Sequence, residues 1–375
     1  MSNNGNTEYV ETIIIGAGQA GLATGYYLSR EGLPHLILEA GERVGAAWRK
    51  RWDSLCLFTP ARVDALPGMP YPGPAHSFPS KDEFADYLEA YAEYFGLAVR
   101  TGVRVSRLSR HGDYLIVEAG EQRFDARNVV VATGHYQAPK LPPFAGELDG
   151  SIVQLHADAY RNPSQLQDGP VLVVGAGNTG AELALETARE HETWLSGRDV
   201  GSVPFNIEGF SGRLLAPIVA RVFFHQVAKA TTPVGRRLHR KARHHGLPLV
   251  RTKPAHLKAA GVERVPPVAG VHQGRPQLTD GRVLEPANVI WCTGFYADFS
   301  WIDLPVFDDE GEPVHERGVV PGEPRLYFMG LLFQQAASST QIHGVERDAR
   351  HIVRNLVRER GRLPADAAAT VEAAG

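Results

Sequence analysis

Cysteine is nearly absent from this sequence, which holds only Cys56 and Cys292 in 375 residues. The two lie far apart and form no CxxC pair, so dithiol redox exchange and a framework of more than one disulfide are excluded. The polar start, MSNNGNTEYV, lacks the charged and apolar segments of a signal peptide, and a cytoplasmic location is therefore expected. The apolar stretch 214–228 is interrupted by Arg221 and His225 and is too short to span a bilayer.

A strong charge of one sign is also lacking. The formal net charge is −3, with 43% hydrophobic and 22% charged residues, as in ordinary globular proteins. This balance indicates neither nucleic acid nor an anionic membrane as a partner. The 15 histidines form no HxxxH motif with a carboxylate companion, so no metal site is expected. A local basic cluster is interpreted as a solvated helix face, with a phosphate-contacting edge as the alternative: Arg236, Arg237, Arg240, Lys241 and Arg243.

A glycine-rich segment near the N-terminus, GAGQAG at 16–21, has the context of a dinucleotide-binding loop. An apolar, β-branched run precedes it and a predicted helix follows it. Gly16 would make the tight turn, Gly18 would admit a pyrophosphate, and Gly21 would let helix and strand pack closely. The next predicted strand ends at Glu39, whose carboxylate can accept ribose hydroxyls and repels a 2′-phosphate. These features assign FAD to the first loop.

A second glycine loop, GAGNTG at 175–180, repeats this context between a predicted buried strand and a predicted helix. No carboxylate ends the strand that follows this helix. Ser196 and Arg198 stand there instead. They favour NADP, because a guanidinium binds a phosphate through paired charged hydrogen bonds. NAD remains the alternative if Arg198 is only a surface residue.

The two loops predict an α/β chain with two dinucleotide-binding, Rossmann-like domains, the NADP domain being inserted into the FAD domain. We assign residues 1–162 and 285–375 to the FAD domain and residues 163–284 to the NADP domain. A helical insert at about 201–265, with helices near 213–229 and 233–245, is expected to line or gate the substrate pocket. Strands are also predicted at 99–105, 114–119, 171–174 and 283–292. The helical pattern of 80–95 begins with a capping box of Ser80 and Glu83. Two dinucleotide sites in one chain indicate that one cofactor reduces the other.

Longer segments around both loops match the pattern of one family. They are GAGQAGLA (16–23) with Glu39, WRKRWDSLCLFTP (48–60), PSKDEFADYLEAYA (79–92), VVVATGHYQAPKLP (129–142), FAG (144–146), HADAY (156–160), VLVVGAGNTGAELA (171–184), WCTGF (291–295) and LYFMGL (326–331). The sequence thereby resembles the flavin-containing monooxygenases, and most of all their bacterial and plant YUCCA-type branch. Tyr160 followed by Arg161 favours this branch over the Baeyer–Villiger enzymes.

The resemblance implies that NADPH reduces FAD and that O₂ then adds to the reduced flavin at C4a. The hydroperoxide so formed would oxygenate a small molecule with a soft nucleophilic centre, such as nitrogen or sulfur. Thr59 is a candidate to face flavin N5, and Asn178 a candidate to contact the nicotinamide nucleotide. Each has a structural alternative, Thr59 as a turn hydroxyl and Asn178 as a helix-start residue. His156 is expected to link the domains.

The remaining expected cofactor-binding residues lie in the two loops, at the strand ends that carry Thr-Gly pairs, and in segments that match the family. They are Gln19, Ala20, Ala40, Trp48, Phe58, Val105, Ala132, Thr133, Gly134, Gly175, Gly177, Thr179, Gly180, Thr293, Gly294 and Gly330.

Rival hypotheses differ in the chemistry they need. A disulfide reductase would need a cysteine pair, and a flavin-binding regulator would have no use for a hydride donor. An NAD(P)H-dependent flavin oxidase or quinone reductase stays open. The sequence does not reveal the substrate or the oligomeric state. A homodimer is compatible with it. Four aromatic residues of the insert suggest an apolar or aromatic substrate, although such residues are more often core: Phe205, Phe210, Phe223 and Phe224.

Overall fold

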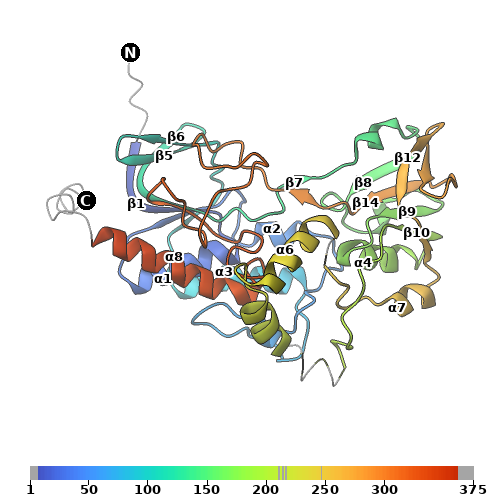
Figure 1. The fold of residues 1–375 in the computed structure, drawn as a ribbon, viewed down its shortest axis with the longest axis horizontal. Helices are drawn as coiled ribbons and strands as arrows, with labels where there is room; N and C mark the ends of the chain where they lie inside the picture. Colours follow the sequence, from blue (N-terminus) through green and yellow to red (C-terminus); the bar gives the residue numbers. More distant parts are fainter. Residues whose placement is uncertain (1–6, 210–211, 213–214, 216–217, 246, 362–375) are drawn as a thin grey trace, which may run out of the picture.

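The computed structural model describes residues 7–361, except 210–211, 213–214, 216–217 and 246. Two sheets with their helices form two lobes, joined by a narrow connection (Figure 1). The chain builds most of the first lobe, crosses to the second, and returns to complete the first. This arrangement confirms the predicted α/β fold class, in which one dinucleotide-binding unit is inserted into the other.

The first sheet has the strand order β3-β2-β1-β6-β5-β4, and β16 also pairs with β6. β1, β2, β3 and β16 run parallel to their neighbours, whereas β4 and β5 form an antiparallel meander with β6. The long β6 is shared along one edge, because its first half pairs with β5 and its last three residues pair with β16. The strands are β1 (Thr7–Ile15), β2 (Leu36–Leu38), β3 (Val99–Arg100), β4 (Arg107–His111), β5 (Tyr114–Ala119), β6 (Gln122–Val131) and β16 (Leu326–Phe328).

Helices α1 (Gln19–Arg30), α3 (Lys81–Tyr94) and α8 (Val345–Arg360) pack together beside this sheet (Figure 1). The capping box predicted for α3 is present, since Ser80 Oγ accepts the Glu83 N–H and the Glu83 carboxylate accepts the Ser80 N–H. The short helices of the lobe are α2 (Ala46–Arg49), η1 (Ala61–Val63) and η5 (Ile342–Gly344).

The second sheet is entirely parallel, with the order β11-β10-β9-β14-β8. Helix α4 (Asn178–Thr187) packs on it, and α7 (Pro254–Ala259) packs against α4. The strands are β8 (Val153–His156), β9 (Val171–Val174), β10 (Thr193–Ser196), β11 (Glu263–Val265) and β14 (Asn288–Trp291), with the hairpin β12 (Val268–His272) and β13 (Arg275–Leu278) beside them and η2 (Pro143–Glu147) and η3 (Pro163–Gln165) in the connections.

The limits of this sheet differ from the predicted NADP domain, 163–284. β8 and β14 lie outside that range, yet both belong to the second sheet, since β14 pairs with β9 on one side and β8 on the other. Their membership depends on pairing between segments more than 100 residues apart, which local patterns do not reveal. The second sheet therefore extends from Val153 to Trp291.

Two segments connect the lobes, and they pair with each other. β7 (Ala138–Pro139) leads into the second lobe, and β15 (Phe295–Tyr296) leads out of it. The two form an antiparallel ribbon at the narrow connection in Figure 1. The lobes are thus joined by a paired ribbon.

Several predicted elements are shorter in the structure. The strand expected at 99–105 ends at Arg100, because Gly102 turns the chain with a φ of 70°. The strand expected at 283–292 covers only 288–291, since Pro286 lacks the N–H that a ladder requires. The two helices expected in the insert are not shortened: Gly212, Leu215 and Ile218 are helical ahead of the π-helix η4 (Val219–Val227), and α6 spans Pro233–His245.

The capping box of α3 generates a prediction on stability. Ser80→Ala removes the acceptor for the Glu83 N–H and should lower the free energy of unfolding by about 1 kcal/mol. Urea denaturation measures the loss. Ser80→Asp, which keeps an acceptor, should lose much less, and equal losses in both variants would contradict the role of the cap.

Candidate functional site

The first glycine loop links the end of β1 to the start of α1, at a place where side chains do not fit. A Cβ on Gly16, whose φ is 108°, would stand 2.7 Å from the Ala132 carbonyl oxygen, and one on Gly21 would stand 1.9 Å from the Gly16 oxygen. A Cβ on Gly18 would meet nothing within 4 Å. Gly16 and Gly21 therefore pack the turn, whereas Gly18 leaves open space at the helix N-terminus, as a pyrophosphate requires.

Glu39 holds this loop from the end of β2. Its Oε2 accepts the Ala17 N–H and its Oε1 accepts the Gly41 N–H, each at 2.8 Å. Each carboxylate oxygen can accept a second hydrogen bond, so capacity for ribose hydroxyls remains. Ala40, beside it, is exposed. The carboxylate thus lies where the sequence pattern predicts.

Other predicted residues gather around the same loop. Trp48 Nε1 donates to Gln19 Oε1 at 3.3 Å, and the indole packs edge-on against Phe84. Gly330, which follows β16, lies beside Ala20, because a Cβ on it would be 3.5 Å from that methyl group. Thr133 and Gly134 follow β6, and Gln137 donates to both at 2.8 Å. The carboxyl ends of β1, β6 and β16 therefore meet at this loop.

Two predicted residues lie less directly at the loop. Phe58 is partly exposed, in the segment that follows α2. Val105 is half-buried and packs against a cluster of buried hydrophobic side chains in the first lobe. It follows Val103, whose N–H donates to the Glu39 carbonyl at 2.9 Å, so its segment adjoins the end of β2.

Thr59 has a buried partner that sequence reasoning missed. Its Oγ1 donates to Asp64 Oδ1 at 2.6 Å, and Asp64 is fully buried. Burial raises the pKa of Asp64 to about 8, although the Thr59 hydrogen bond opposes the shift. Asp64 Oδ2 has no hydrogen-bond partner among the described residues. A neutral carboxylic acid with its proton on Oδ2 fits these surroundings, because an ionised one would leave a charge unpaired in the core. A single acid in an irregular loop gives no sequence signal for this pairing.

The second glycine loop repeats the geometry of the first. A Cβ on Gly175, whose φ is 112°, would stand 2.2 Å from the Cys292 carbonyl oxygen, and one on Gly180 would stand 1.7 Å from the Gly175 oxygen. A Cβ on Gly177 would again meet nothing within 4 Å. Thr179 is half-buried in the first turn of α4. Both loops therefore fit the pyrophosphate of a dinucleotide by the same test.

Two basic side chains lie near the end of β10, the position that corresponds to Glu39 in the first unit and where the ribose of a dinucleotide would bind. Arg198 is exposed just after β10. Arg264, on the neighbouring β11, donates to the Gly197 carbonyl at 3.0 Å. Ser196 is fully buried, donates to the Pro266 carbonyl and accepts the Val268 N–H. Arg264 therefore joins Arg198 as a candidate to contact the nucleotide, whereas the Ser196 hydroxyl already has two hydrogen-bond partners within the protein. Recognising that Arg264 lies near the end of the adjacent parallel strand could have found it from sequence.

Asn178 joins the second loop to the insert. Its Nδ2 donates to the Pro248 carbonyl at 3.1 Å, and its Oδ1 accepts the Val250 N–H at 2.9 Å. The next residue along the insert, Arg251, forms an ion pair with Glu208 at 3.2 Å and lies over the Phe78 ring of the first lobe. Asn178 thus fastens a segment that reaches across to the first lobe.

The predicted linking residues lie at the connection between the lobes. His156 Nδ1 accepts the Asp158 N–H, so Nε2 carries the proton and donates to the Gly294 carbonyl at 3.0 Å. Burial lowers the pKa of His156, which favours this neutral ring. Its ring packs edge-on against Phe295, over which the Arg51 guanidinium also lies.

Two further residues secure the same connection. Thr293, on the segment that leaves the second lobe, donates to the carbonyl of Lys140, on the segment that enters it. Tyr160, the family's aromatic position, is fully buried and donates to Glu186 Oε2 at 2.9 Å, which ties the segment after β8 to α4. Both have structural roles.

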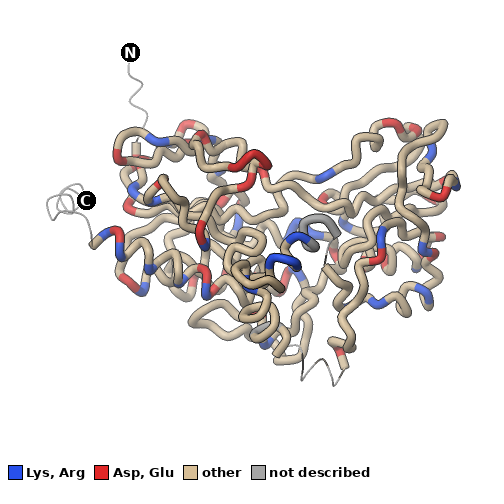
Figure 2. The backbone as a smooth tube through the Cα atoms, in the orientation of Figure 1, with Lys and Arg blue, Asp and Glu red and all other residues tan. Residues whose placement is uncertain are grey.

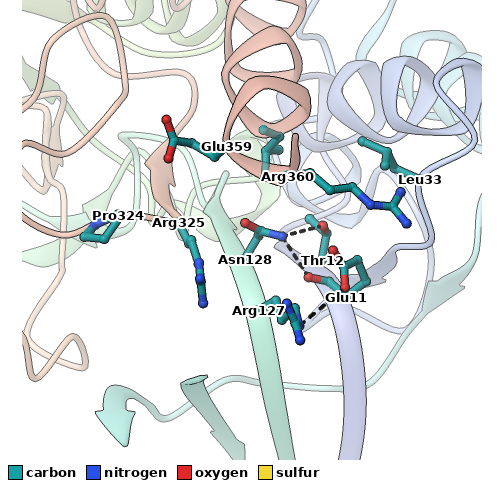
Figure 3. Close-up of a pocket in the computed structure, with 10 residues that line it drawn as sticks. Glu11, Thr12, Leu33, Arg127, Asn128, Pro324, Arg325, Glu359 and Arg360 are labelled. Carbon is teal, nitrogen blue, oxygen red and sulfur yellow. Dashed lines mark hydrogen bonds and ion pairs between the residues drawn. The ribbon is translucent and has the colours of Figure 1, made fainter. Parts of the chain in front are cut away.

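A cavity of about 280 Å³ lies elsewhere, at the far end of α1 (Figure 3). Asn128 bridges its floor by donating to the Glu11 carbonyl and to Thr12 Oγ1, and Leu33 and Arg360 form its rim. α1 has 12 residues, so the first glycine loop lies about 18 Å away along the helix. This cavity is separate from the cofactor loops.

The chain is similar to known proteins over most of its length. The family model described as pyridine nucleotide-disulphide oxidoreductase matches residues 13–199. An uncharacterized CzcO-like oxidoreductase of Geobacillus kaustophilus is 38% identical over 93% of this chain and 98% of its own. A flavin-containing monooxygenase structure from Stenotrophomonas maltophilia superposes with a TM-score of 0.74, at 28% identity, over 94% of this chain and 99% of that one. The chain belongs to the flavin-containing monooxygenase family.

Membership confirms the predicted family, and with it FAD and NADP as the cofactors of a flavin-dependent monooxygenase. The YUCCA-type likeness also holds, since a probable indole-3-pyruvate monooxygenase, YUCCA3 of Arabidopsis thaliana, is 29% identical over 85% of this chain and 81% of its own. Cys56 and Cys292 are both free thiols. In the part of the chain that the structure describes, no helix is both long and apolar enough to cross a membrane.

The buried acid at Asp64 generates a prediction on pH dependence. Its folded pKa of about 8 exceeds the ordinary 3.8, so the folded state binds the extra proton and stability falls as the pH rises from about 4 to about 8. Asp64→Asn mimics the neutral acid and should remove this part of the slope, with a gain of up to a few kcal/mol at pH 8. Urea denaturation across this pH range measures it.

The exposed Asp113→Asn serves as the control and should leave the slope as it is in the parent protein. A slope that Asp64→Asn also leaves unchanged would show that Asp64 is ionised in the folded protein.

Proposed function

We propose that this protein is an NADPH-dependent monooxygenase that transfers one atom of O₂ to a small soft nucleophile, through the flavin chemistry that the family resemblance implies. The observation that carries the proposal is that the two glycine loops differ in the side chains near the expected ribose. The first loop has the carboxylate of Glu39 there, and the second has the guanidinium groups of Arg198 and Arg264. Such a pair suits one nucleotide without a 2′-phosphate and one with it.

The first loop would hold FAD. The open space at Gly18 and the N-terminus of α1 would receive the pyrophosphate, and Glu39 the ribose. Trp48 and Gln19 would flank the entry to the loop. The second loop would hold NADPH at Gly177, with the 2′-phosphate near Arg198 and Arg264. When bound, the nicotinamide supplies a hydride and the flavin supplies the activation of O₂.

The chain's own contribution would be to position these groups and to exclude water. Thr59 and Asp64 would hold a proton at Asp64 Oδ2, so that the Thr59 hydroxyl keeps a defined orientation. Asn178 would act through the insert segment that it fastens, by keeping that segment over the second loop. Both are therefore positioning residues in this proposal.

The insert would bound the substrate site. Phe205 is half-buried, Phe224 packs in a small cluster with Phe333, and Phe223 is partly exposed. Phe210 lies outside the described residues. An apolar or aromatic substrate remains the expectation. A homodimer and a cytoplasmic location also stay predictions.

The test of this function separates oxygen transfer from simple oxidation. Anaerobic NADPH should bleach the visible absorbance of the bound flavin. With O₂ and a panel of amines, sulfides and keto acids, at least one compound should yield an oxygenated product in proportion to the NADPH consumed. H₂O₂ as the product with every compound would favour the flavin oxidase or quinone reductase alternative, and a flavin that NADPH does not bleach would end the proposal.

The cofactor preference gives a separate prediction. Arg198→Glu should raise the KM for NADPH about tenfold or more, because a charged hydrogen bond to the 2′-phosphate contributes about 1.5–3 kcal/mol. The KM for NADH should change little. Steady-state kinetics with both nucleotides measure the ratio, with the exposed Arg189→Glu as a control for net charge. Equal losses with NADPH and NADH would argue that Arg198 does not read the phosphate.

A further inference from the structure

The net charge of −3 conceals a segment with an extreme composition. From Gly209 to Val262 the sequence contains 11 Lys and Arg residues and no Asp or Glu, although acids number 42 in the whole chain. This segment holds η4 and α6, so its basic character is localised in the insert. Lys and Arg gather on the described part of α6 (Figure 2). The overall charge balance is therefore no guide to the partners of this surface.

An exposed apolar stripe adjoins the basic helix. The stripe consists of Ile218, just before η4, the adjacent pair Val222 and Phe223, and Val227. The pair lies four or five residues from Ile218 and from Val227, the spacing that brings side chains to one face of a π-helix. Their exposed fractions lie between 38% and 51%. Scattered apolar side chains on a surface are ordinary, but a contiguous stripe marks an interaction site.

Both elements turn their opposite faces toward the same core. Phe224 of η4 and Leu238 of α6 pack in a small cluster with Phe333 and Ala337 of the first lobe, and His239 stacks on the Phe333 ring. Arg236 and Arg240 are exposed and lie two residues to either side of Leu238, hence on the other side of the helix. The apolar stripe and the arginines therefore both face away from the protein.

We propose that η4 and α6 form a docking surface for an anionic membrane, on which the protein lies without crossing the bilayer. Apolar side chains beside exposed cations suit the boundary between lipid headgroups and acyl chains, where the stripe is buried and the arginines meet lipid phosphates. A second copy of the chain is a poorer occupant, since an isologous contact would bring together two segments that are rich in Lys and Arg and contain no Asp or Glu. Nucleic acid is also a poorer one, because its phosphate backbone would leave the stripe uncovered.

The experiment uses the FAD-loaded protein and vesicle co-sedimentation. Vesicles of phosphatidylcholine with about one quarter phosphatidylglycerol should retain it, and vesicles of phosphatidylcholine alone should bind it at least tenfold more weakly. High salt should weaken the binding, because it screens exposed charges. Each cation near an anionic leaflet strengthens binding about fivefold, so Arg236→Glu with Arg240→Glu should reduce the affinity by more than about twentyfold.

Matched variants separate the two parts of the surface. Val222→Ser with Val227→Ser should weaken binding while keeping its salt dependence. The controls are Arg104→Glu with Arg189→Glu, and Val283→Ser with Val314→Ser, which make the same changes at exposed positions outside the segment. FAD content and melting temperature check that every variant is folded.

Three outcomes would overturn the proposal. The first is equal binding to neutral and anionic vesicles, or none to either. The second is a dimer, seen by light scattering, that dissociates when Val222 and Val227 are changed, since a second copy would then cover the stripe. The third is binding to duplex DNA that depends on Arg236 and Arg240 but not on the stripe, without retention on the vesicles.

Discussion

Each lobe depends on one close approach between a glycine loop and the carbonyl oxygen that ends a neighbouring strand. The Ala132 and Cys292 oxygens lie only 2.7 and 2.2 Å from where a Cβ on Gly16 and Gly175 would stand, which is too close for any side chain. In each lobe this contact brings the end of the neighbouring strand close to the N-terminus of the helix that follows the glycine loop, where free N–H groups favour an anion. Each crossing segment begins directly after one of these carbonyls, so both cofactor loops lie beside the connection between the lobes.

Local patterns in the sequence predict the parts of the molecule that local chemistry determines. β5 and β9 have the predicted bounds, the α3 capping box is present, and Glu39 lies against its loop. Pairing between distant segments is not encoded locally, which is why the ranges expected for the FAD domain, 1–162 and 285–375, include β8 and β14 of the second sheet. The burial of Asp64 has the same origin, since it arises only when the loop after Thr59 folds over its own acid.

Charge acts at two scales in this protein. At the second loop a few guanidinium groups are placed one by one, and Arg264 reaches the Gly197 carbonyl from the adjacent strand. In the insert the same residue type is accumulated over a segment without acids. The first arrangement suits a single phosphate and the second an extended anionic surface. The net charge of the whole chain reveals neither arrangement.

The ribbon of β7 and β15 has a mechanical consequence. Its two strands belong to the outgoing and returning chain, and their hydrogen bonds keep them in register. Such a ribbon resists sliding of one strand past the other but bends readily out of its plane. The pairing therefore opposes a shear between the lobes, and the contacts of Arg251 with Phe78 and of Phe224 with Phe333 hold the lobes together away from the ribbon. Motion about the ribbon alone would have to break both contacts, so they help to fix the distance between the two nucleotide loops.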